Sequence, residues 1–144
     1  MLGAQWAGTS VGGLKLNAIR ERPWTATTKT GDPLSGTFLH LRYGDWLGSF
    51  FHPRKRLPGP GVEITEAAAN SPARWSMMSP PGLRGEYIPP PGGFVDVHSA
   101  LAYVKLGSAY YPVAVLQKGG VWMVVKATSW PLLQKTLRSL KPID

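Results

Sequence analysis

The pattern of apolar and polar positions along this chain predicts that β-strands make up most of its regular structure. Two runs rich in β-branched residues, 110–117 and 121–127, lie on either side of Lys118-Gly119-Gly120. Such runs, joined by a short turn that contains glycine, are typical of an antiparallel β-hairpin. We therefore expect a hairpin over 110–127.

A second hairpin is predicted closer to the N-terminus, because positions 37–43 alternate strictly between two faces of a strand. One face carries Thr37, Leu39, Leu41 and Tyr43, and the other carries Phe38, His40 and Arg42. Gly44-Asp45 is the expected turn of this hairpin, and 46–51 is its expected return strand. Two further strand candidates are 14–20 and 24–30.

The C-terminal region predicts a helix over 130–140. Ser129 is placed to cap it, and Pro131 suits its first turn. Its apolar stripe consists of Leu132, Leu133, Leu137 and Leu140.

Two shorter helices are also predicted. One covers 66–70, with Thr65 as its cap, and the other runs from a cap at Asp96 or Ser99 through Val104. A strand is the alternative for this second segment.

Together these elements predict a single domain, 1–144, of the α+β or mainly β class. Two antiparallel hairpins form a sheet or a partly open barrel, and the C-terminal helix packs on one face of it. A chain of 144 residues is long enough for a core of its own. The 17 glycines and 14 prolines indicate long Pro/Gly-rich loops. Residues 79–93 are expected to form a Pro/Gly-rich arm, and residues 1–13 an extended N-terminal arm.

The sequence lacks the patterns that most enzymes and metal sites require. It has no cysteine, which excludes disulfides, thiolate nucleophiles and cysteine-ligated metals. Its three histidines, His40, His52 and His98, show no metal-binding spacing, and there is no nucleophile elbow or phosphate-binding glycine loop. We therefore expect a protein that is not an enzyme and that binds no metal or cofactor.

The N-terminal region does not have the pattern of a targeting segment. Residues 1–13 lack a basic stretch followed by an apolar core, and no apolar run approaches the roughly 18 residues of a membrane span. The expected location is the cytoplasm of the producing cell.

The charge of the chain favours anionic partners. Sixteen basic and eight acidic residues give a formal net charge of +8. A basic cluster is formed by His52, Arg54, Lys55 and Arg56, with Arg20, Arg22 and Lys29 upstream. Aromatic residues suited to stacking on bases are Trp24, Tyr43 and Trp46. One alternative function is therefore a basic nucleic-acid-binding module, and the same basic surface also suits an acidic protein partner.

A second alternative is a small metal-independent ribonuclease toxin. Such enzymes use only His, Arg, Lys and Tyr to move protons and to hold the scissile phosphate. His40, Arg42, His52 and Arg54 are the residues that would have to converge.

The function that the sequence favours most is a non-enzymatic structural or interaction subunit of a larger assembly. Six tryptophans exceed what one small core readily hides, and tryptophan is enriched at interface hot spots. The expected partner-binding residues are Trp6, Trp24, Trp75 and Tyr87. The expected partners are other protein subunits, among them further copies of this chain. The most concrete form of this hypothesis is a bacteriophage virion component, in the head, neck, tail or baseplate, which would place the mature protein in the virion.

Overall fold

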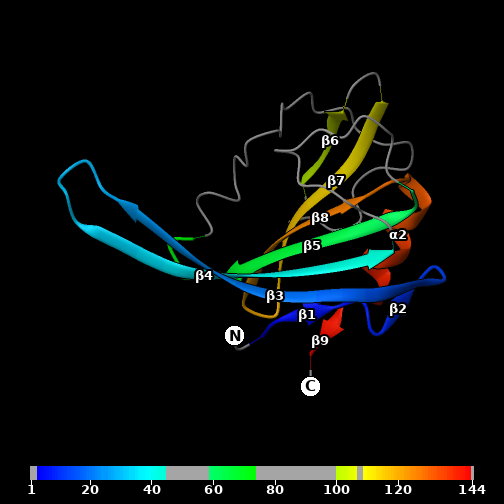
Figure 1. The fold of residues 1–144 in the computed structure, drawn as a ribbon, viewed down its shortest axis with the longest axis horizontal. Coiled ribbons are helices and arrows are strands. Elements are labelled where there is room, and N and C mark those ends of the chain that lie inside the picture. Colours follow the sequence, from blue (N-terminus) through cyan, green and yellow to red (C-terminus); the bar gives the residue numbers. More distant parts are fainter. Residues whose placement is uncertain (1–2, 45–58, 74–99, 107–108, 144) are drawn as a thin grey trace.

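The computed structural model describes residues 3–44, 59–73, 100–106 and 109–143, and these are mostly β-structure (Figure 1). Seven strands form one antiparallel sheet in the order β2-β3-β4-β5-β8-β7-β6. They are β2 (Ser10–Val11), β3 (Leu14–Thr27), β4 (Pro33–Gly44), β5 (Gly61–Ala68), β8 (Val121–Ala127), β7 (Ala109–Lys118) and β6 (Ala100–Leu106). The sheet curls into a half-barrel, which confirms the predicted fold class.

The remaining elements lie against this sheet. Helix α2 (Trp130–Ser139) packs on one of its faces, and the short strands β1 (Gln5–Trp6) and β9 (Lys141–Pro142) pair with each other. In the part of the chain that the structure describes, no helix has the length and apolarity needed to cross a bilayer.

The predicted hairpin over 110–127 is confirmed as β7 and β8. Its turn residues Gly119 and Gly120 both have positive φ angles, 60° and 81°. Positive φ at both central positions is the geometry of a type I′ turn, which matches the right-handed twist of the flanking strands. Only glycine adopts it without steric cost.

The two turn glycines differ in their surroundings, and this difference predicts unequal mutational effects. A Cβ on Gly119 would collide with the side-chain amide of Gln5, whereas a Cβ on Gly120 meets no atom within 4 Å. Backbone strain of about 1–2 kcal/mol is expected for alanine at either position. We expect Gly119→Ala to lower the free energy of unfolding by about 1 kcal/mol more than Gly120→Ala, measured by urea denaturation. Equal losses would show that the approach of Gln5 to this turn is not constraining.

The strand pairing predicted for the hairpin over 37–51 is wrong. The two faces predicted for 37–43 are correct, but β4 pairs with β3 on one edge and with β5 on the other. Both edges of residues 39–43 are thus occupied by β3 and β5. The expected return strand, 46–51, lies outside the described residues. Of the two other strand candidates, 14–20 and residues 24–27 of 24–30 belong to one strand, β3. Residues 28–30 lie instead in the turn at 28–32 that connects β3 to β4.

The two short helices are also wrong where the structure describes them. Residues 66–68 belong to β5, and 100–104 belong to β6, which is the strand alternative. Glu66 resembles a first-turn helix residue in the sequence, yet it lies between Leu39 of β4 and Met123 of β8. Pairing on both edges of β5 overrides the weak helical preference of this alanine-rich segment.

The main core lies between the sheet and α2. Its largest buried side chains include Leu41 and Tyr43 of β4, Ile64 of β5, Met123 of β8 and Leu133 of the helix. The helix has the expected cap, because the Ser129 side chain accepts a hydrogen bond from the Leu132 backbone at 3.3 Å. The rest of the predicted stripe also packs here, with Leu137 and Leu140 buried and Leu132 partly buried.

The N-terminal segment is part of this core. Ala4, Ala7 and Val11 are buried in it. The Tyr43 hydroxyl accepts a hydrogen bond from the Ala7 backbone at 3.0 Å and donates one to the Gly8 carbonyl at 2.8 Å. Residues 3–13, which we expected to form an arm, are therefore extended but lie against the body of the protein.

Candidate functional site

The face of the sheet turned away from α2 carries a cluster of charged and polar side chains, which we call the polar face. It consists of Arg20, Arg22, His40, Arg42, Glu63, Thr65 and Lys126. The cross-strand register places these residues side by side, since Arg20 is opposite His40, which is opposite Thr65. In the next row, Arg42, Glu63 and Lys126 follow one another across three strands.

A β-bulge places the arginines of β3 on this face. Leu16 pairs with Tyr43 and Ala18 with Arg42, so Asn17 is an extra residue in the strand. An extra residue reverses the side to which the following side chains point. Because of the bulge, Leu14 and Leu16 pack on the core beside α2, whereas Arg20 and Arg22 lie beside His40 and Arg42. The Asn17 amide donates a hydrogen bond to the Gly44 carbonyl at this point.

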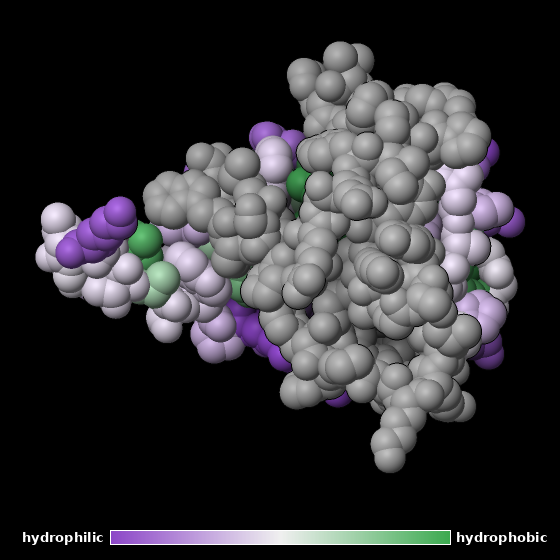
Figure 2. Space-filling view, turned by 90° about the horizontal axis from the view of Figure 1, so that it is seen from above, coloured by the Kyte–Doolittle hydropathy of each residue, from purple (hydrophilic) through white to green (hydrophobic). Residues whose placement is uncertain are grey.

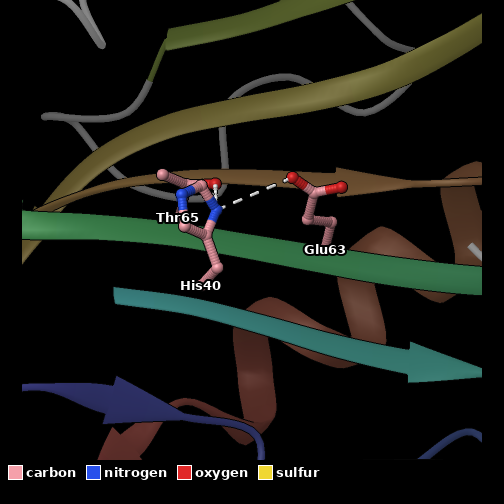
Figure 3. A network of polar contacts seen from close by, with 3 residues as sticks. All are labelled: His40, Glu63 and Thr65. Carbon is pink, nitrogen blue, oxygen red and sulfur yellow. Dashed lines mark hydrogen bonds and ion pairs between the residues drawn. The ribbon is translucent and has the colours of Figure 1, made fainter. Parts of the chain in front are cut away.

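His40, Glu63 and Thr65 form the polar contacts at the centre of the cluster (Figure 3). The His40 Nδ1 atom lies 3.1 Å from the Thr65 hydroxyl and 3.9 Å from Glu63 Oε1. All three side chains project from β4 and β5 on the same side of the sheet (Figure 3). This network fixes the orientation of the imidazole ring.

The environment of His40 keeps its ring neutral. Burial, together with the positive charges of Arg22, Lys126 and Arg42, lowers the pKa of His40 to about 4. At pH 7 the ring is therefore uncharged, and its contact with Glu63 is a polar contact and not an ion pair.

The row formed by Arg42, Glu63 and Lys126 is unusually desolvated for charged residues. Glu63 and Lys126 are buried, with exposed fractions of 9% and 7%. Burial lowers the pKa of Lys126 to about 8, although the charge of Glu63 opposes this shift. The buried Arg42 Nε and Glu63 Oε2 atoms have no hydrogen-bond partner among the described residues. An unpaired buried donor is costly, which makes Arg42 a candidate for ligand contact.

The described residues of the polar face carry charges of both signs. They include four cationic side chains, Arg20, Arg22, Arg42 and Lys126, and one carboxylate, that of Glu63. Arg20 and Arg22 are exposed, and Arg42 is half-buried. Because a histidine with a pKa of about 4 is a poor proton donor and acceptor at neutral pH, these residues are better arranged to hold an anion than to transfer protons.

The hairpin of β3 and β4 forms a second conspicuous feature, because it extends beyond the rest of the sheet (Figure 1). Strand β5 pairs with β4 only from Leu39 to Gly44. Among the described strands, residues 22–38, which we call the arm, therefore pair only with each other. At its base the arm is backed by a later part of the chain, since a Cβ on Gly36 would lie 2.9 Å from that of Ala73.

The tip of the arm is closed by a compact set of hydrogen bonds. The Thr28 backbone N–H donates to the Asp32 carbonyl at 2.9 Å, and the Asp32 backbone N–H donates to the Thr28 hydroxyl at 2.9 Å. The Thr30 hydroxyl donates to the Asp32 carboxylate at 2.8 Å. These local bonds give the tip a defined shape without help from the rest of the sheet.

The structure describes only some of the residues predicted to be functional. Trp6 packs partly buried against the main core, and Trp24 packs partly buried against a smaller cluster around Ala67 and Ala73. Tyr43 is fully buried, so its expected role in stacking on bases is wrong. The other predicted contacts lie outside the described residues, namely Trp46, His52, Arg54, Lys55, Arg56, Trp75 and Tyr87.

Sequence reasoning proposed His40 and Arg42 together, and the structure places them on one face. It missed Glu63, Thr65 and Lys126, because Thr65 was interpreted as the cap of a helix over 66–70 and Lys126 only as part of the strand 121–127. The alternation of apolar and polar residues over 62–65 was the signal that would have placed Glu63 and Thr65 on one face. Among the described residues there is no group of His, Asp and Glu that could hold a metal ion.

Comparisons with known proteins identify no relative of this chain. No protein-family model matches the chain, and neither a curated protein nor a solved structure matches it.

Proposed function

We propose that this chain is a non-enzymatic structural subunit of a larger protein assembly and that the arm is one of its contacts with a neighbouring subunit. The projection of residues 22–38 beyond the sheet carries this proposal. In its most concrete form the assembly is a bacteriophage particle, assembled after synthesis in the cytoplasm of the producing cell. The neighbouring subunit is taken to be a second copy of this chain.

The energetics of a two-stranded ribbon support this role for the arm. A hairpin without further strands or a packed helix is only marginally stable in water. The arm has β-pairing up to Thr27 and Pro33 although none of the other described strands accompanies it there. Docking on a neighbour would supply the missing burial, and the hydrogen-bonded tip would lose little conformational entropy in doing so.

The chemistry of the arm favours contact through its faces and not through its edge. Pro23 lies in the outer strand and cannot donate a backbone hydrogen bond to an added strand. Glu21 and Arg22 add charges at the same place, which also disfavours pairing of strand edges. One face of the ribbon carries Ala26 and Leu34 opposite each other. Figure 2 shows apolar surface on the projecting hairpin, next to hydrophilic residues.

Shortening the arm tests the proposal. Trp24 and Gly36 are opposite each other, so residues 25–35 can be replaced by Asn-Gly, which closes a two-residue type I′ turn. We expect the wild-type chain to form a discrete oligomer in sedimentation velocity at micromolar concentrations. The shortened chain should sediment as a monomer, and its thermal unfolding midpoint should change by no more than a few degrees.

Recording the sedimentation at 260 and 280 nm separates protein oligomers from complexes with nucleic acid. A matched control is Lys135→Ala on the exposed side of α2, which should leave the oligomer unchanged. The proposal is contradicted if the shortened chain forms the same oligomer as the wild type. It is equally contradicted if the wild type is monomeric at every concentration.

A further inference from the structure

The N-terminal segment is held against the core by side chains of two strands of the sheet, and this contact points to a movable part of the fold. We propose that residues 3–8, which we call the strap, open about Gly8 as a unit of their own when Glu66 loses its proton, while the seven-stranded sheet stays folded. The strap lies on the side of the sheet that carries α2, and its opening does not involve the arm.

The strap can separate without breaking the main sheet. Among the described strands, β1 pairs with β9 alone, outside the seven-stranded sheet (Figure 1). Contact with the larger sheet begins after the strap, where the Leu16 backbone N–H donates to the Thr9 carbonyl at 2.9 Å and β2 pairs with β3. Opening residues 3–8 therefore leaves the described strand pairs of the larger sheet intact, which is the condition for local opening without global unfolding.

The residues of the strap suit such a movement. Gly8 has a φ of 85°, in the left-handed region that glycine adopts without steric cost, and it lies where the strap joins the rest of the chain. The strap side chains that are buried in the main core, Ala4 and Ala7, are small, and Trp6 is only partly buried. Opening therefore exposes little apolar area, and hydrogen bonds contribute much of what holds the strap closed.

Three hydrogen bonds join the strap to two side chains that are fully buried, those of Tyr43 and Glu66. Tyr43 accepts from the Ala7 backbone and donates to the Gly8 carbonyl. The Gln5 backbone N–H donates to Glu66 Oε1 at 2.6 Å, and Glu66 Oε2 has no partner among the described residues. A buried carboxylate with so few donors is costly, whereas a protonated carboxyl group is not.

Among the described residues, the titratable group that interacts with Glu66 is Tyr43. Burial raises the pKa of Tyr43 above its usual value of 10, although the bond from Ala7 opposes the shift, so the hydroxyl stays neutral while Glu66 titrates. The residues of the strap, β8 and α2 that are buried in the main core are uncharged. The cations of β7, α2 and β9 on this side are exposed, namely Lys118, Lys135, Arg138 and Lys141.

Deprotonation of Glu66 therefore favours the open state, in which water reaches the carboxylate. Burial raises the pKa of Glu66 from 4.5 to about 7 in the closed state, although the bond from Gln5 opposes the shift. The advantage of the closed state is complete below pH 4.5 and is lost as the pH rises through 7. From these two values, the ratio of open to closed molecules should rise about 40-fold between pH 4.5 and 6.5.

A single introduced cysteine measures this opening, because the chain has no cysteine of its own. Ala4→Cys places a thiol in the buried part of the strap, where 4,4′-dithiodipyridine reacts with it only in the open state. Dividing the labelling rate by that of an unstructured peptide thiol at the same pH removes the titration of the thiol itself. We expect the normalised rate to rise about 40-fold between pH 4.5 and 6.5.

A matched control separates local opening from global unfolding. Ala114→Cys places the same thiol in the core on β7 and should be labelled at least about tenfold more slowly at every pH. Its rate should change little between pH 4.5 and 6.5, because global unfolding also releases His40, whose titration has the opposite sign. His40 lies on the other face of the sheet and does not contribute to opening of the strap.

Two further variants, each combined with Ala4→Cys, separate the charge of Glu66 from the mere number of bonds. Glu66→Gln can still accept the bond from Gln5 but cannot ionise, so the rise in labelling with pH should disappear. Tyr43→Phe loses two bonds to the strap without a change of charge. It should raise labelling by roughly tenfold at each pH and leave the rise between pH 4.5 and 6.5 in place.

Hydrogen exchange of the Gln5 and Ala7 backbone amides in the wild type gives the same readout without an introduced thiol, once it is corrected for the intrinsic rate at each pH. Two results would overturn the proposal. One is that Ala4→Cys is labelled no faster than Ala114→Cys, which would mean that the strap opens only when the whole domain unfolds. The other is that the rise with pH persists in Glu66→Gln, which would assign it to another group.

Discussion

Removal of residues 1–8 is expected to lower the free energy of unfolding by about 3–5 kcal/mol, because these residues satisfy two buried polar groups. The Gln5 backbone N–H donates to the Glu66 carboxylate at 2.6 Å. The Tyr43 hydroxyl uses both of its hydrogen bonds on Ala7 and Gly8. Each buried group left without a partner costs about 1–3 kcal/mol, and the buried contacts of Ala4 and Ala7 are lost as well.

Urea denaturation of the truncated and full-length chains measures this loss. The variant in which Asn-Gly replaces residues 25–35 is the matched control. It removes a similar length of chain, but from a segment that the other described strands do not pair with. We expect that control to lose no more than about 1 kcal/mol. Tyr43→Phe in the full-length chain isolates one part of the effect and should cost about 1–3 kcal/mol.

A truncated chain that unfolds at the same urea concentration as the full-length chain would contradict this account. It would mean that residues 1–8 form a detachable arm, as the sequence suggested, and that Tyr43 and Glu66 find other partners. A large effect of arm shortening with a small effect of truncation would have the same meaning.

The second large effect is a pair of opposing pH dependences, from Glu66 and His40. Glu66 is fully buried on the core side of the sheet, and burial raises its pKa to about 7 although its bond from Gln5 opposes the shift. His40, on the other face, has its pKa lowered to about 4. At about 1.4 kcal/mol per pKa unit, each group changes the stability by about 3 kcal/mol over its window.

The two contributions have opposite signs. Folded Glu66 retains its proton up to a higher pH than unfolded Glu66, so its contribution to stability is present below pH 4.5 and is lost as the pH rises towards 7. Folded His40 resists protonation, so its contribution is present above pH 6.5 and is lost as the pH falls towards 4. Between pH 4.5 and 6.5 the two slopes cancel in the wild type.

Single variants should therefore reveal slopes that the wild type hides. With Glu66→Gln, which can still accept the bond from Gln5, stability should rise with pH between 4.5 and 6.5. With His40→Gln, stability should fall over the same range. Urea denaturation at several pH values measures both, and the remaining titratable groups are common to all three proteins.

If all three proteins have the same pH profile, neither group is perturbed as described. A second check on Glu66 comes from its hydrogen bonds, because Glu66 Oε2 and Gln5 Oε1 are both buried acceptors without a partner among the residues that the structure describes. Protonation turns one of these acceptors into a donor, which is consistent with a carboxyl group that stays neutral well above its usual pKa.

The correct predictions depend on residues close together in the sequence, whereas the incorrect ones depend on residues far apart in it. The hairpin at 118–120 was predictable because two glycines with positive φ permit the turn that adjacent strands require. The helix α2 was predictable because its cap, its proline and its leucine stripe all lie within a dozen residues. The two faces of β4 follow from alternation alone. In each case the information lies within one element.

The partner of β4 was not predictable from Gly44-Asp45, although this dipeptide favours a turn. Which strand pairs with residues 39–44 depends on β5, whose sequence begins 17 residues after Gly44, at Gly61. The polar face was only partly predictable for the same reason. His40 and Arg42 are neighbours on one strand, whereas Glu63 and Lys126 reach them only through two further strand pairings.

The sequence by itself determined the strand-rich class, the β7–β8 turn, the capped helix α2 and the side of β4 that faces the core. The tertiary structure alone decided that Ala4, Ala7 and Val11 lie in the core, that Glu66 is buried, and that, among the described residues, Arg20, Arg22, Arg42 and Lys126 share one face with Glu63. The physical reason is that turns, caps and alternation depend on neighbouring residues. Burial and the grouping of charges depend on contacts between segments far apart in the sequence, as between Ala4 and Ile143, and their free energy is not contained in any local pattern.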